Sequence, residues 1–474
     1  MGLYMQEVNY KKASTYYLVG SLFNKGMAFL TVPIFTRILS TSDYGIVNTY
    51  NSWIAIVSML IGFALHMSIR IAFVDYREQI NEFMSVTTTF VIGVGFLISG
   101  FVLIGMSLIE GSVGVTLVVL CLLQGMATAL LENYSMYLMM QYRYKFRTII
   151  MILPNLVSVI ISTLAILFIV KTNLYMGRIV PTAVVHMFFG ILIAVLIYRK
   201  SKLLYKREYL KYGLMISTPL ILHGIALNIL SQLDRTMITW LASASQTGIY
   251  SLIYNFSMIA MVITTAIDGV WVPWFMGKYK ERKIEEINKL SVDYTKVITY
   301  AMVGLILVGP EIVRILASEK YWEGIVIIPP VVLANYMIFL YMFYVNVEHF
   351  HKKTVYITIN TLIAAGVNVL LNYIFIPRYG YIAAAYTTLA AYAIAFILHA
   401  KYAKKLEKKL YPISMFGPSL IHIVVATTLF YMLIDFGVLR WSIAIIYICV
   451  MFYINLTKIK QFFPALERFP FFRK

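Results

Sequence analysis

The chain has 474 residues, of which 61% are hydrophobic and only 13% are charged. Soluble domains are nearer to half apolar and a quarter charged, so this composition excludes an ordinary soluble fold and indicates an integral membrane protein. Lysine and arginine number 40 against 21 acidic residues, which gives a net charge of +19. In a membrane protein the position of such an excess along the chain has to be known before it indicates a nucleic-acid partner.

Apolar segments long enough to span a bilayer recur along the whole chain. Six precede the first long basic loop: 14–36, 45–67, 85–108, 113–139, 148–170 and 176–198. Eight follow it: 212–233, 248–271, 294–316, 324–347, 354–376, 380–400, 413–434 and 441–456. The first segment has full membrane length and lacks a small-residue cleavage site, so we expect it to be helix one and not a signal peptide.

The basic residues alternate between the two sides of these segments. The two tails and the even-numbered connections hold 31 of the 40, and the odd-numbered connections hold seven. Because cytoplasmic loops retain lysine and arginine, this predicts a multi-pass protein of the cytoplasmic membrane with both termini in the cytoplasm. The positive charge therefore indicates topology and contact with anionic lipid, not a nucleic-acid partner.

The two halves of the chain show a faint repeat. Lys25 lies twelve residues before Arg37, and His223 lies twelve residues before Arg235. In the segments that follow, small and polar residues match at a constant offset of 203, beginning with Gly45 and Gly248. Such copies would be related by an axis along the membrane normal. The alternative is coincidence, since helix seams in membranes favour small residues in general.

The residues Thr36-Arg-Ile-Leu-Ser-Thr-Ser-Asp-Tyr-Gly45 resemble the "R-x-L-S-x-x-D/E-Y-G" connection of the polysaccharide transporter family of lipid-linked oligosaccharide flippases. Leu233-Asp-Arg235 and Thr247-Gly-Ile-Tyr250 are similar to the corresponding segment of the second half. The wider superfamily includes the multidrug and toxic compound extrusion antiporters and the lipid II flippase. The resemblance implies an all-α integral membrane protein with two pseudo-symmetric six-helix lobes around a central cavity.

On this basis we expect four parts in the chain. Residues 1–198 form an N-terminal lobe, 199–211 a basic cytoplasmic linker, 212–400 a C-terminal lobe, and 401–474 two further helices with a cytoplasmic tail. By analogy with the lipid II flippase, the last two helices would help to form a groove for a lipid tail.

Lys25 lies near the middle of the first segment, in a polar stripe that also contains Asn24. A charge at this depth costs roughly 2.5 to 3.5 kcal/mol on insertion scales and normally faces a cavity or a partner. We therefore expect Lys25 to contact a phosphate or an acidic sugar. The alternative is a buried ion pair with Glu132 or Asp268.

His223 occupies the place in the seventh segment that matches Lys25, and a histidine can change its charge near neutral pH. It shares a helical face with Asp234, whereas Asn228 and Arg235 belong to a separate polar stripe on the same segment. The alternative role for His223 is that of a packed hydrogen-bonding group.

Glu132 and Asp268 each lie about one third of the way in from the predicted cytoplasmic side, and they are candidates for coupling to a proton or sodium gradient. Structural pairing with basic residues is the alternative. At the outer edge, Arg37 with Asp234 and Arg235 would form a gate or bind a pyrophosphate, because arginine forks match phosphate oxygens. Interfacial snorkelling is the other reading of these arginines.

The segment 354–376 carries a one-sided polar seam that includes Asn368 and Asn372. Their amides are long enough to bind sugar hydroxyls in the cavity, and tight packing against a neighbouring helix is the alternative. The two cysteines, Cys121 and Cys449, lie in apolar runs without metal-site spacing, so we expect them to be buried small hydrophobes.

The sequence shows no phosphate-binding glycine loop and no long extramembrane loop for an acidic active site. We therefore expect a transporter and not an enzyme, with no catalytic residues, no metal and no cofactor beyond a proton or sodium gradient or the membrane potential. A membrane-bound glycan polymerase is the less favoured enzymatic alternative.

The sequence thus predicts a flippase that moves a polyprenyl-pyrophosphate-linked oligosaccharide repeat unit across the membrane by alternating access. The glycan would serve a cell-surface polysaccharide such as O-antigen, capsule or exopolysaccharide. The expected partners are this glycolipid, membrane lipids, and a glycan polymerase with other assembly proteins, and the chain is expected to be monomeric. The alternative within the superfamily is an ion-coupled antiporter of drugs or cations.

Overall fold

The computed structural model describes residue 29, residues 31–107 and residues 114–454; inside α8, α9 and α14 the side chains of residues 219, 220, 222, 223, 266, 267, 269, 270 and 452 are not described. The described residues form helices and no β-strand. By its internal contacts the chain divides into two compact units, Met1–Gly248 and Ile249–Lys474, here called unit 1 and unit 2.

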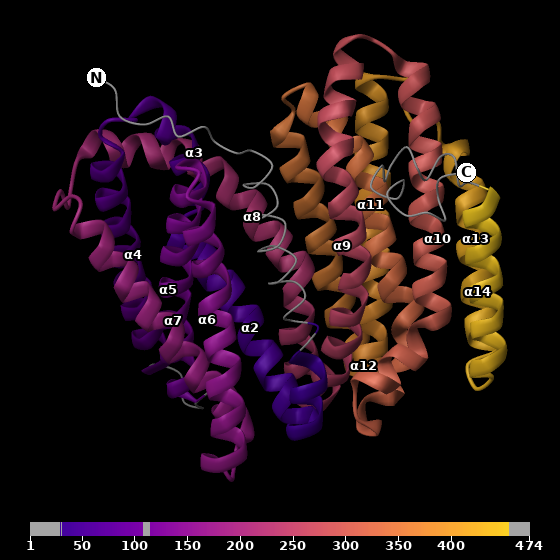
Figure 1. Ribbon diagram of the computed structural model, residues 1–474, viewed down its shortest axis with the longest axis horizontal. Coiled ribbons are helices and arrows are strands. Elements are labelled where there is room, and N and C mark those ends of the chain that lie inside the picture. The colour runs from indigo at the N-terminus through magenta and orange to yellow at the C-terminus, as the bar shows by residue number, and fades with distance from the viewer. Residues whose placement is uncertain (1–28, 30, 108–113, 455–474) are drawn as a thin grey trace. The chain divides into compact units, whose positions relative to one another are not determined.

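Among its described residues, unit 1 (Figure 1) contains seven labelled α-helices and one π-helical turn. They are α2 (Thr41–Gly62), α3 (Leu65–Asp75), α4 (Ile80–Ser107), α5 (Val115–Met140), α6 (Tyr144–Leu164) with the π-helical turn η1 (Ala165–Ile169), α7 (Leu174–Tyr198) and α8 (Arg207–Leu241). Residues 31–38, the described end of the first predicted segment, are also helical. The predicted remainder of that helix lies outside the described residues.

The start of α2 is fixed by a capping box. The Ser40 hydroxyl accepts a hydrogen bond from the Asp43 backbone N–H at 3.0 Å, and the Asp43 carboxylate accepts one from the Ser40 backbone N–H at 3.4 Å. Two backbone donors that the first turn would leave unpaired are thereby satisfied. The helix therefore begins at Thr41, four residues before the start predicted from apolarity.

The predicted helix over 45–67 is wrong in one respect, because the structure divides it into α2 and α3. Phe63 and Ala64 adopt left-handed φ values of 52° and 51° between the two helices. Left-handed backbone is unfavourable for residues with a Cβ, so surrounding packing has to hold this bend. Ala64 is buried, and its carbonyl accepts a hydrogen bond from the Ser217 hydroxyl of α8 at 3.3 Å.

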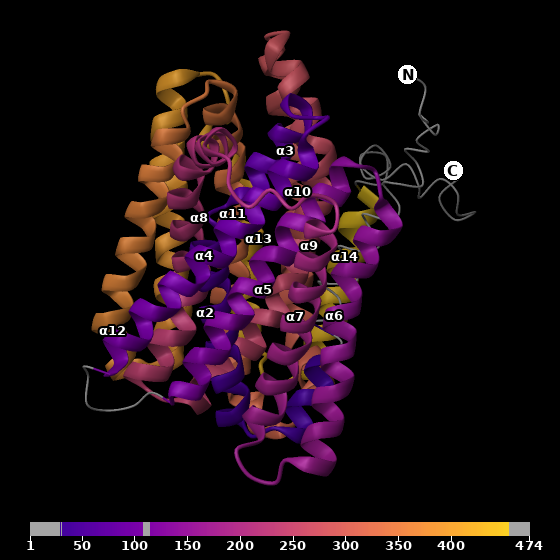
Figure 2. The ribbon, with the colours of Figure 1, turned by 90° about the vertical axis from the view of Figure 1, so that its left-hand side faces the viewer.

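In unit 1, α5 packs against α2, α3, α4, α6 and α7, and Figure 2 shows it among these helices in the turned view. Small residues allow the close approach. A Cβ on Gly125 would lie 2.5 Å from a Val57 methyl group, and a Cβ on Gly190 would lie 2.9 Å from the Ala127 Cβ. Packing of this kind is typical of helices in membranes, where lipid removes the hydrophobic drive for helices to associate.

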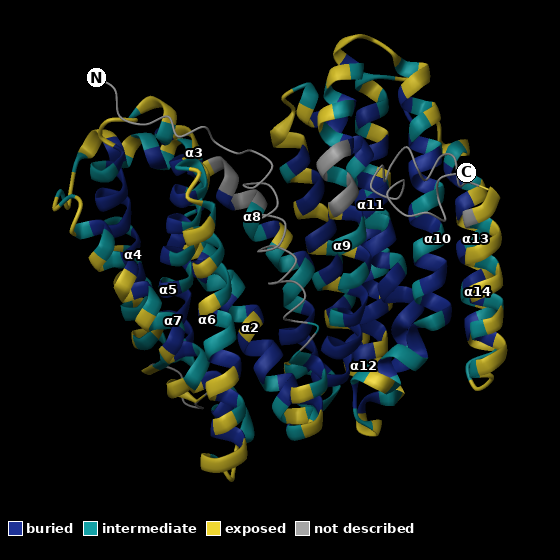
Figure 3. Ribbon diagram, viewed as in Figure 1, coloured by how far each residue is buried: buried dark blue, intermediate teal, exposed yellow. Residues whose placement is uncertain are grey.

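Unit 2 takes most of α9 (Ala244–Lys280), together with α10 (Ile284–Leu316), the 3₁₀ segment η2 (Glu319–Ile327), α11 (Ile328–Phe350), α12 (Thr354–Leu406), η3 (Ile413–Phe416), α13 (Gly417–Met432) and α14 (Gly437–Ile454). Figure 3 shows α11 largely buried, whereas α13 and α14 carry exposed residues along their length. Cys121 is buried as expected, but Cys449 is exposed because α14 lies at the edge of unit 2 and presents an apolar outer face.

The helix α12 is a hairpin of two legs. The chain turns at Gly380, whose φ of 58° and ψ of −142° favour glycine. The legs are antiparallel, because Tyr356 stacks on Tyr402 with centroids 4.0 Å apart while Asn368 bonds Thr388 nearer the bend. The two predicted segments 354–376 and 380–400 correspond to these legs.

Ten helices of the described residues are long and apolar enough to cross a membrane by length and composition. The 53 residues of α12 count once in that number although they form two legs. The prediction of an all-α integral membrane protein is confirmed. The predicted lobe boundaries stay predictions; in the structure α8 packs on α2, α3 and α4 within unit 1.

Candidate functional site

The first turns of α2 and α9 touch at two glycines within unit 1. A Cβ on Gly45 would lie 1.7 Å from the Ala244 carbonyl oxygen, and a Cβ on Gly248 would lie 2.1 Å from the Thr41 carbonyl oxygen. Neither position has space for any side chain. The two contacts are reciprocal, since Thr41 and Gly45 precede Ala244 and Gly248 by the same offset that the sequence repeat shows.

Hydroxyl groups join the same elements around the glycine contact. The Thr41 and Ser245 hydroxyl oxygens are 2.7 Å apart, so one donates to the other. Thr239 of α8 links the two helices, with its hydroxyl 2.6 Å from that of Thr49 and 2.7 Å from that of Thr247. Neutral hydroxyl pairs contribute little net free energy, on the order of 1 kcal/mol each, so such a contact forms and breaks with a small change in free energy.

The predicted outer-edge residues lie in different surroundings. Arg235 is 4% exposed, and its Nη1 donates to Gln232 Oε1 at 2.8 Å and to the Ser231 carbonyl at 3.2 Å. Its neighbour Asp234 is buried. Arg37 is exposed, and its Nη1 donates to the Pro33 carbonyl at 2.8 Å. The structure therefore places Arg235 beside the contact of α2 with α9, since the Arg235 carbonyl accepts a hydrogen bond from Thr247 at 3.3 Å.

Arg178 is a half-buried cation that none of the sequence-based predictions above names. In the structure it lies inside α7, with its guanidinium 4.3 Å from the centre of the Phe35 ring and its Nη1 3.3 Å from the Ser162 hydroxyl. A cation–π contact away from bulk water gains strength. The signal that could have located it is its position inside the apolar segment 176–198.

Asp268 of α9 is bonded to one member of an aromatic cluster in unit 2. The Tyr294 hydroxyl donates to its Oδ1 at 2.9 Å, and the Tyr294 ring lies 5.2 Å from that of Trp271 and 4.9 Å from that of Phe339. The Trp271 indole N–H is buried and has no hydrogen-bond partner among the described residues. A half-buried carboxylate with a free indole donor and ring faces has the chemistry to bind a hydroxylated or a cationic group.

Glu132 and Asn228 both belong to unit 1. Glu132 is exposed on α5, one turn from Thr128, whose hydroxyl donates to the Gln124 carbonyl at 2.8 Å. Asn228 is half-buried on α8, and its amide donates to the Gly224 carbonyl at 3.0 Å.

Asn368 and Asn372 are buried between the two legs of α12. The Asn368 amide donates to the Thr388 hydroxyl at 3.3 Å, and the Asn372 amide donates to Asn368 Oδ1 at 3.3 Å. The Thr387 hydroxyl donates to Asn372 Oδ1. In this conformation the side-chain amides therefore serve the seam between the legs, and their predicted contact with sugar hydroxyls stays a prediction.

Three predicted residues have no described side chain. Asn24 and Lys25 lie outside the described residues, and for His223 only the backbone in α8 is described. Their predicted contacts with substrate stay predictions. Within the described part of the chain, no group of three or more His, Cys, Asp or Glu side chains has an arrangement that could hold a metal ion.

A tyrosine and carboxylate cluster joins the α3–α4 connection to the start of α8. Tyr76 donates to Glu208 Oε1 at 3.1 Å, Tyr209 donates to Glu82 Oε2 at 3.0 Å, and Tyr212 donates to Asp75. Partial burial and the hydrogen bond to Glu208 raise the pKa of Tyr76 above its ordinary value of 10.0. We call these three pairs the tyrosine clamp.

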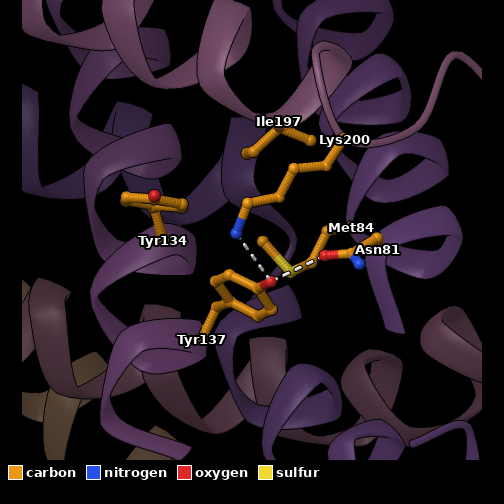
Figure 4. Close-up of a pocket in the computed structure, with 6 residues that line it drawn as sticks. All are labelled: Asn81, Met84, Tyr134, Tyr137, Ile197 and Lys200. Atoms are coloured by element: carbon orange, nitrogen blue, oxygen red, sulfur yellow. Dashed lines mark hydrogen bonds between the residues drawn. The ribbon is translucent and has the colours of Figure 1, made fainter. Parts of the chain in front are cut away.

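Beside the tyrosine clamp is a narrow crevice that does not admit a water molecule (Figure 4). The Lys200 ammonium donates to the Tyr137 hydroxyl at 3.2 Å, and that hydroxyl donates to Asn81 Oδ1 at 2.7 Å. The six lining side chains come from α4, α5 and the residues around the end of α7. These side chains fill the crevice, which therefore has no room for a glycan. Their contacts join the ends of these helices.

The family of the chain follows from its sequence. Residues 10–277 match the family described as "Polysaccharide biosynthesis protein", a stretch that covers more than half of the chain and includes both helix starts that carry Gly45 and Gly248. The chain belongs to this family. The resemblance read from the connection 36–45 is thereby confirmed.

Two relatives in Haemophilus influenzae are similar over most of the chain. "Lsg locus putative protein 1" is 23% identical over 355 residues, which cover 70% of this chain and 84% of that protein. A protein named "Uncharacterized membrane protein" is 23% identical over 353 residues, which cover 72% of this chain and 84% of that protein.

Solved structures with the same fold are membrane transporters. The lipid II flippase MurJ in an inward closed conformation superposes with a TM-score of 0.68 at 15% identity, covering 93% of this chain and 99% of that chain. An inward-facing multidrug resistance transporter of the MATE family gives 0.59 at 13% identity, covering 84% and 99%. A MOP superfamily transporter from Pyrococcus furiosus gives 0.56 at 14% identity, covering 84% and 96%. The chain therefore has the MOP superfamily fold.

Proposed function

We propose that this protein is a flippase that carries a polyprenyl-pyrophosphate-linked oligosaccharide from the cytoplasmic to the outer leaflet for cell-surface polysaccharide synthesis. A polar glycan does not cross hydrocarbon unaided, because each unsatisfied polar group there costs several kcal/mol. Membership of the polysaccharide biosynthesis family supports a glycan as the cargo, and the fold shared with the lipid II flippase supports a lipid-linked one. O-antigen, capsule or exopolysaccharide units are the expected class.

The observation that carries this proposal is the reciprocal contact of Gly45 with Ala244 and of Gly248 with Thr41. It joins two helix starts through bare backbone and neutral hydroxyl pairs, which separate without exposing a charge or a large apolar surface. Alternating access needs such a closure that opens in each cycle. In our proposal the closure lies at the outer side, with the basic loops and both termini in the cytoplasm, as the asymmetry of lysine and arginine predicts.

Within this mechanism, Lys25 would attract the anionic head group, and Arg37 and Arg235 would receive the pyrophosphate as it emerges, because guanidinium forks match phosphate oxygens. A proton or sodium gradient or the membrane potential would supply the energy, with Glu132, Asp234, Asp268 or His223 as coupling residues. The protein would act as a monomer in the cytoplasmic membrane, beside a glycan polymerase and other assembly proteins.

A disulfide across the glycine contact tests the proposal. The Thr41 and Ser245 hydroxyls are 2.7 Å apart, so cysteines at both positions place their sulfur atoms within bonding reach. The double variant T41C/S245C is reconstituted in vesicles with a fluorescent polyprenyl-diphosphate-linked disaccharide, and a glycosidase outside the vesicles reports translocation. We expect oxidation to stop translocation and a reductant to restore it.

The single variants T41C and S245C are the controls, and both should translocate before and after oxidation. Undiminished translocation by a fully cross-linked double variant would show that this contact does not open. Equal rates in vesicles with and without the protein would rule out the flippase itself.

The alternative function is an ion-coupled antiporter of drugs or cations. The observation that favours it is Asp268, a carboxylate bonded to Tyr294, whose ring packs against those of Trp271 and Phe339, since ring faces and a carboxylate both attract cations. Overexpression in a drug-sensitive host decides between the two. Resistance to a cationic dye such as ethidium would favour the antiporter, and unchanged sensitivity with restored polymer export would favour the flippase.

A further inference from the structure

Two titratable side chains that none of the roles above uses are buried against each other in unit 2. Glu348 lies near the C-terminal end of α11, and His399 lies in the second leg of α12. Their side chains are 0% and 1% exposed. His399 Nδ1 lies 2.9 Å from Oε2 and 3.1 Å from Oε1 of Glu348, so the imidazole N–H donates to the carboxylate.

A stack of aromatic rings lies against this pair. Tyr341 stacks on the His399 ring with centroids 5.4 Å apart and planes 20° apart, and on its other neighbour Tyr392 at 6.4 Å and 15°. The other titratable groups close to the pair or to its ring wall are His349 of α11, Tyr402 in the second leg of α12, Tyr356 of the first leg, which stacks on Tyr402, and Tyr254 of α9. Because both side chains of the pair are almost fully buried, bulk water does not screen them, which strengthens their electrostatic interaction.

The chemistry of the two partners sets this pair apart from a permanent salt bridge. Arg440 ion-pairs with Glu311 elsewhere in unit 2, and an arginine cannot lose its proton in a protein. Among the ion pairs of the described residues, Glu348 has only His399 as its partner, and histidine is the side chain that titrates around neutral pH. The charge of this buried pair therefore depends on the number of protons it holds.

A neutral imidazole always carries one ring proton. With one further proton the pair is neutral overall, as carboxylate and imidazolium or as carboxylic acid and imidazole. A second proton taken from water protonates the Glu348 carboxylate beside the imidazolium and leaves a net charge of +1. Loss of that one further proton leaves a buried carboxylate at −1. Either charged state costs several kcal/mol in an apolar environment, so protons enter or leave only as α11 and the second leg of α12 move apart.

We propose that Glu348 and His399 form a proton-binding site that couples the transport cycle to a proton gradient. The neutral pair holds α11 against the second leg of α12, and a second proton that binds while the two helices are apart keeps them apart. This inference rests on the proposed transport function, and it names the coupling ion and a site that the sequence analysis did not consider.

The proton site is tested first without any transport substrate. The full chain, with isotope-labelled histidine, is placed in lipid nanodiscs, and the imidazole NMR signals are followed between about pH 5 and pH 8. The signal absent in H399Q belongs to His399. We expect it to shift with pH in the parent protein and to lose that shift in E348Q. A His399 signal that stays fixed in the parent, or that shifts equally in E348Q, would overturn the proposal.

The coupling is then tested in vesicles with the fluorescent polyprenyl-diphosphate-linked disaccharide. An imposed pH gradient should accelerate translocation by the parent protein, and E348Q and the double variant E348Q/H399Q should lose that acceleration. The double variant replaces the pair by two neutral amides that can still bond to each other, so it guards against loss of folding in the single variant. H186Q is the matched control, since His186 bonds the Thr182 carbonyl and has no carboxylate partner among the described residues.

The two tests separate the proposals. A protein that moves no glycolipid while its His399 titrates would reject the flippase and keep the proton site. A protein that moves glycolipid with the same pH response in the parent and in E348Q would reject the coupling site and keep the flippase.

Discussion

Gly45 and Gly248 are the two residues whose identity the structure constrains most directly at the candidate site. A methyl group at either position overlaps a carbonyl oxygen of the opposite helix, so the helix starts must separate to accommodate it. Overpacking of this kind costs about 1 to 3 kcal/mol. The cost falls on the conformation in which the two helices touch and not on the separated one.

We therefore predict that G45A and G248A shift the protein toward the separated conformation. In a T41C/S245C background either change should slow disulfide formation by about tenfold, which corresponds to a shift of about 1.4 kcal/mol. The measurement is the rate of cross-linking on oxidation. G93A and G277A are matched controls, because a Cβ at those glycines meets no atom within 4 Å. Cross-linking of G45A at the parental rate would mean that the backbone relaxes without separating the helices.

At the scale of elements, the tyrosine clamp attaches the start of α8 to the α3–α4 connection in unit 1. Lys206, just before α8, lies over the Tyr209 ring at 4.0 Å, and its hydrogen bond to Tyr209 raises the pKa of Lys206. The linker over 199–211 is thereby held through Lys206 as well as through Tyr209. Motion of the start of α8 would carry the α3–α4 connection with it.

The clamp should weaken at alkaline pH and not at neutral pH. The raised pKa of Tyr76 means that the folded protein favours the neutral phenol. The contribution of Tyr76 to stability is therefore complete below about pH 10 and is lost as the pH rises through the pKa that Tyr76 has in the folded protein. Limited proteolysis of the linker across this range measures the effect. Y76F, which cannot ionise, should lose the alkaline rise in cleavage that depends on this residue. An identical pH profile in Y76F would assign the transition to another group.

At the scale of the whole molecule, the C-terminal hairpin of α13 and α14 depends on one buried arginine. Arg440 is 0% exposed, donates to the Leu307, Leu433 and Ile434 carbonyls at 2.7 to 2.8 Å, and ion-pairs with Glu311 of α10. The same carboxylate accepts a hydrogen bond from the Trp441 indole at 2.7 Å. The connection between the last two helices is thus fixed to α10 by a nearly complete set of hydrogen bonds.

Replacing Arg440 by alanine leaves the Glu311 carboxylate and three carbonyls without this partner. Breaking a buried pair in this way costs about 3 to 5 kcal/mol, so we predict that R440A lowers the thermal unfolding temperature in detergent and exposes residues 433–436 to protease. R314A is the control, because Arg314 is 36% exposed and lies 3.5 Å from the same carboxylate. Its loss should cost about 1 kcal/mol or less. Equal destabilisation by both changes would contradict the anchoring role of Arg440.

The apolar helices and their order along the chain could be predicted from the sequence, because a bilayer dictates the length of each apolar segment. The helix ends could not, since several helices continue past the apolar segment: α8 begins at Arg207 and α10 at Ile284, earlier than the predicted 212 and 294. The capping residues Ser40 and Asp43 are a local signal that gives the start of α2. The bend at Phe63 and Ala64 has no such signal, because neither residue type favours left-handed backbone.

The contacts of the candidate site depend on tertiary folding and could not be predicted from the sequence. The offset of 203 marks Gly45 and Gly248 as matching positions of the repeat, but only the structure shows that their helix starts touch. Glu348 and His399 were missed because they lie 51 residues apart, on different helices and at no repeated spacing. The hairpin turn at Gly380 brings their helices side by side, and no sequence pattern near either residue predicts that contact.

The glycine contact has a consequence for the history of the chain. Each helix start contributes two equivalent positions, Thr41 and Gly45 in α2 and Ala244 and Gly248 in α9. The first position of each helix meets the glycine of the other. This is the isologous pattern that a twofold axis imposes on two identical subunits. It is what remains inside one polypeptide if a shorter ancestor paired with a second copy of itself before its gene was duplicated and fused.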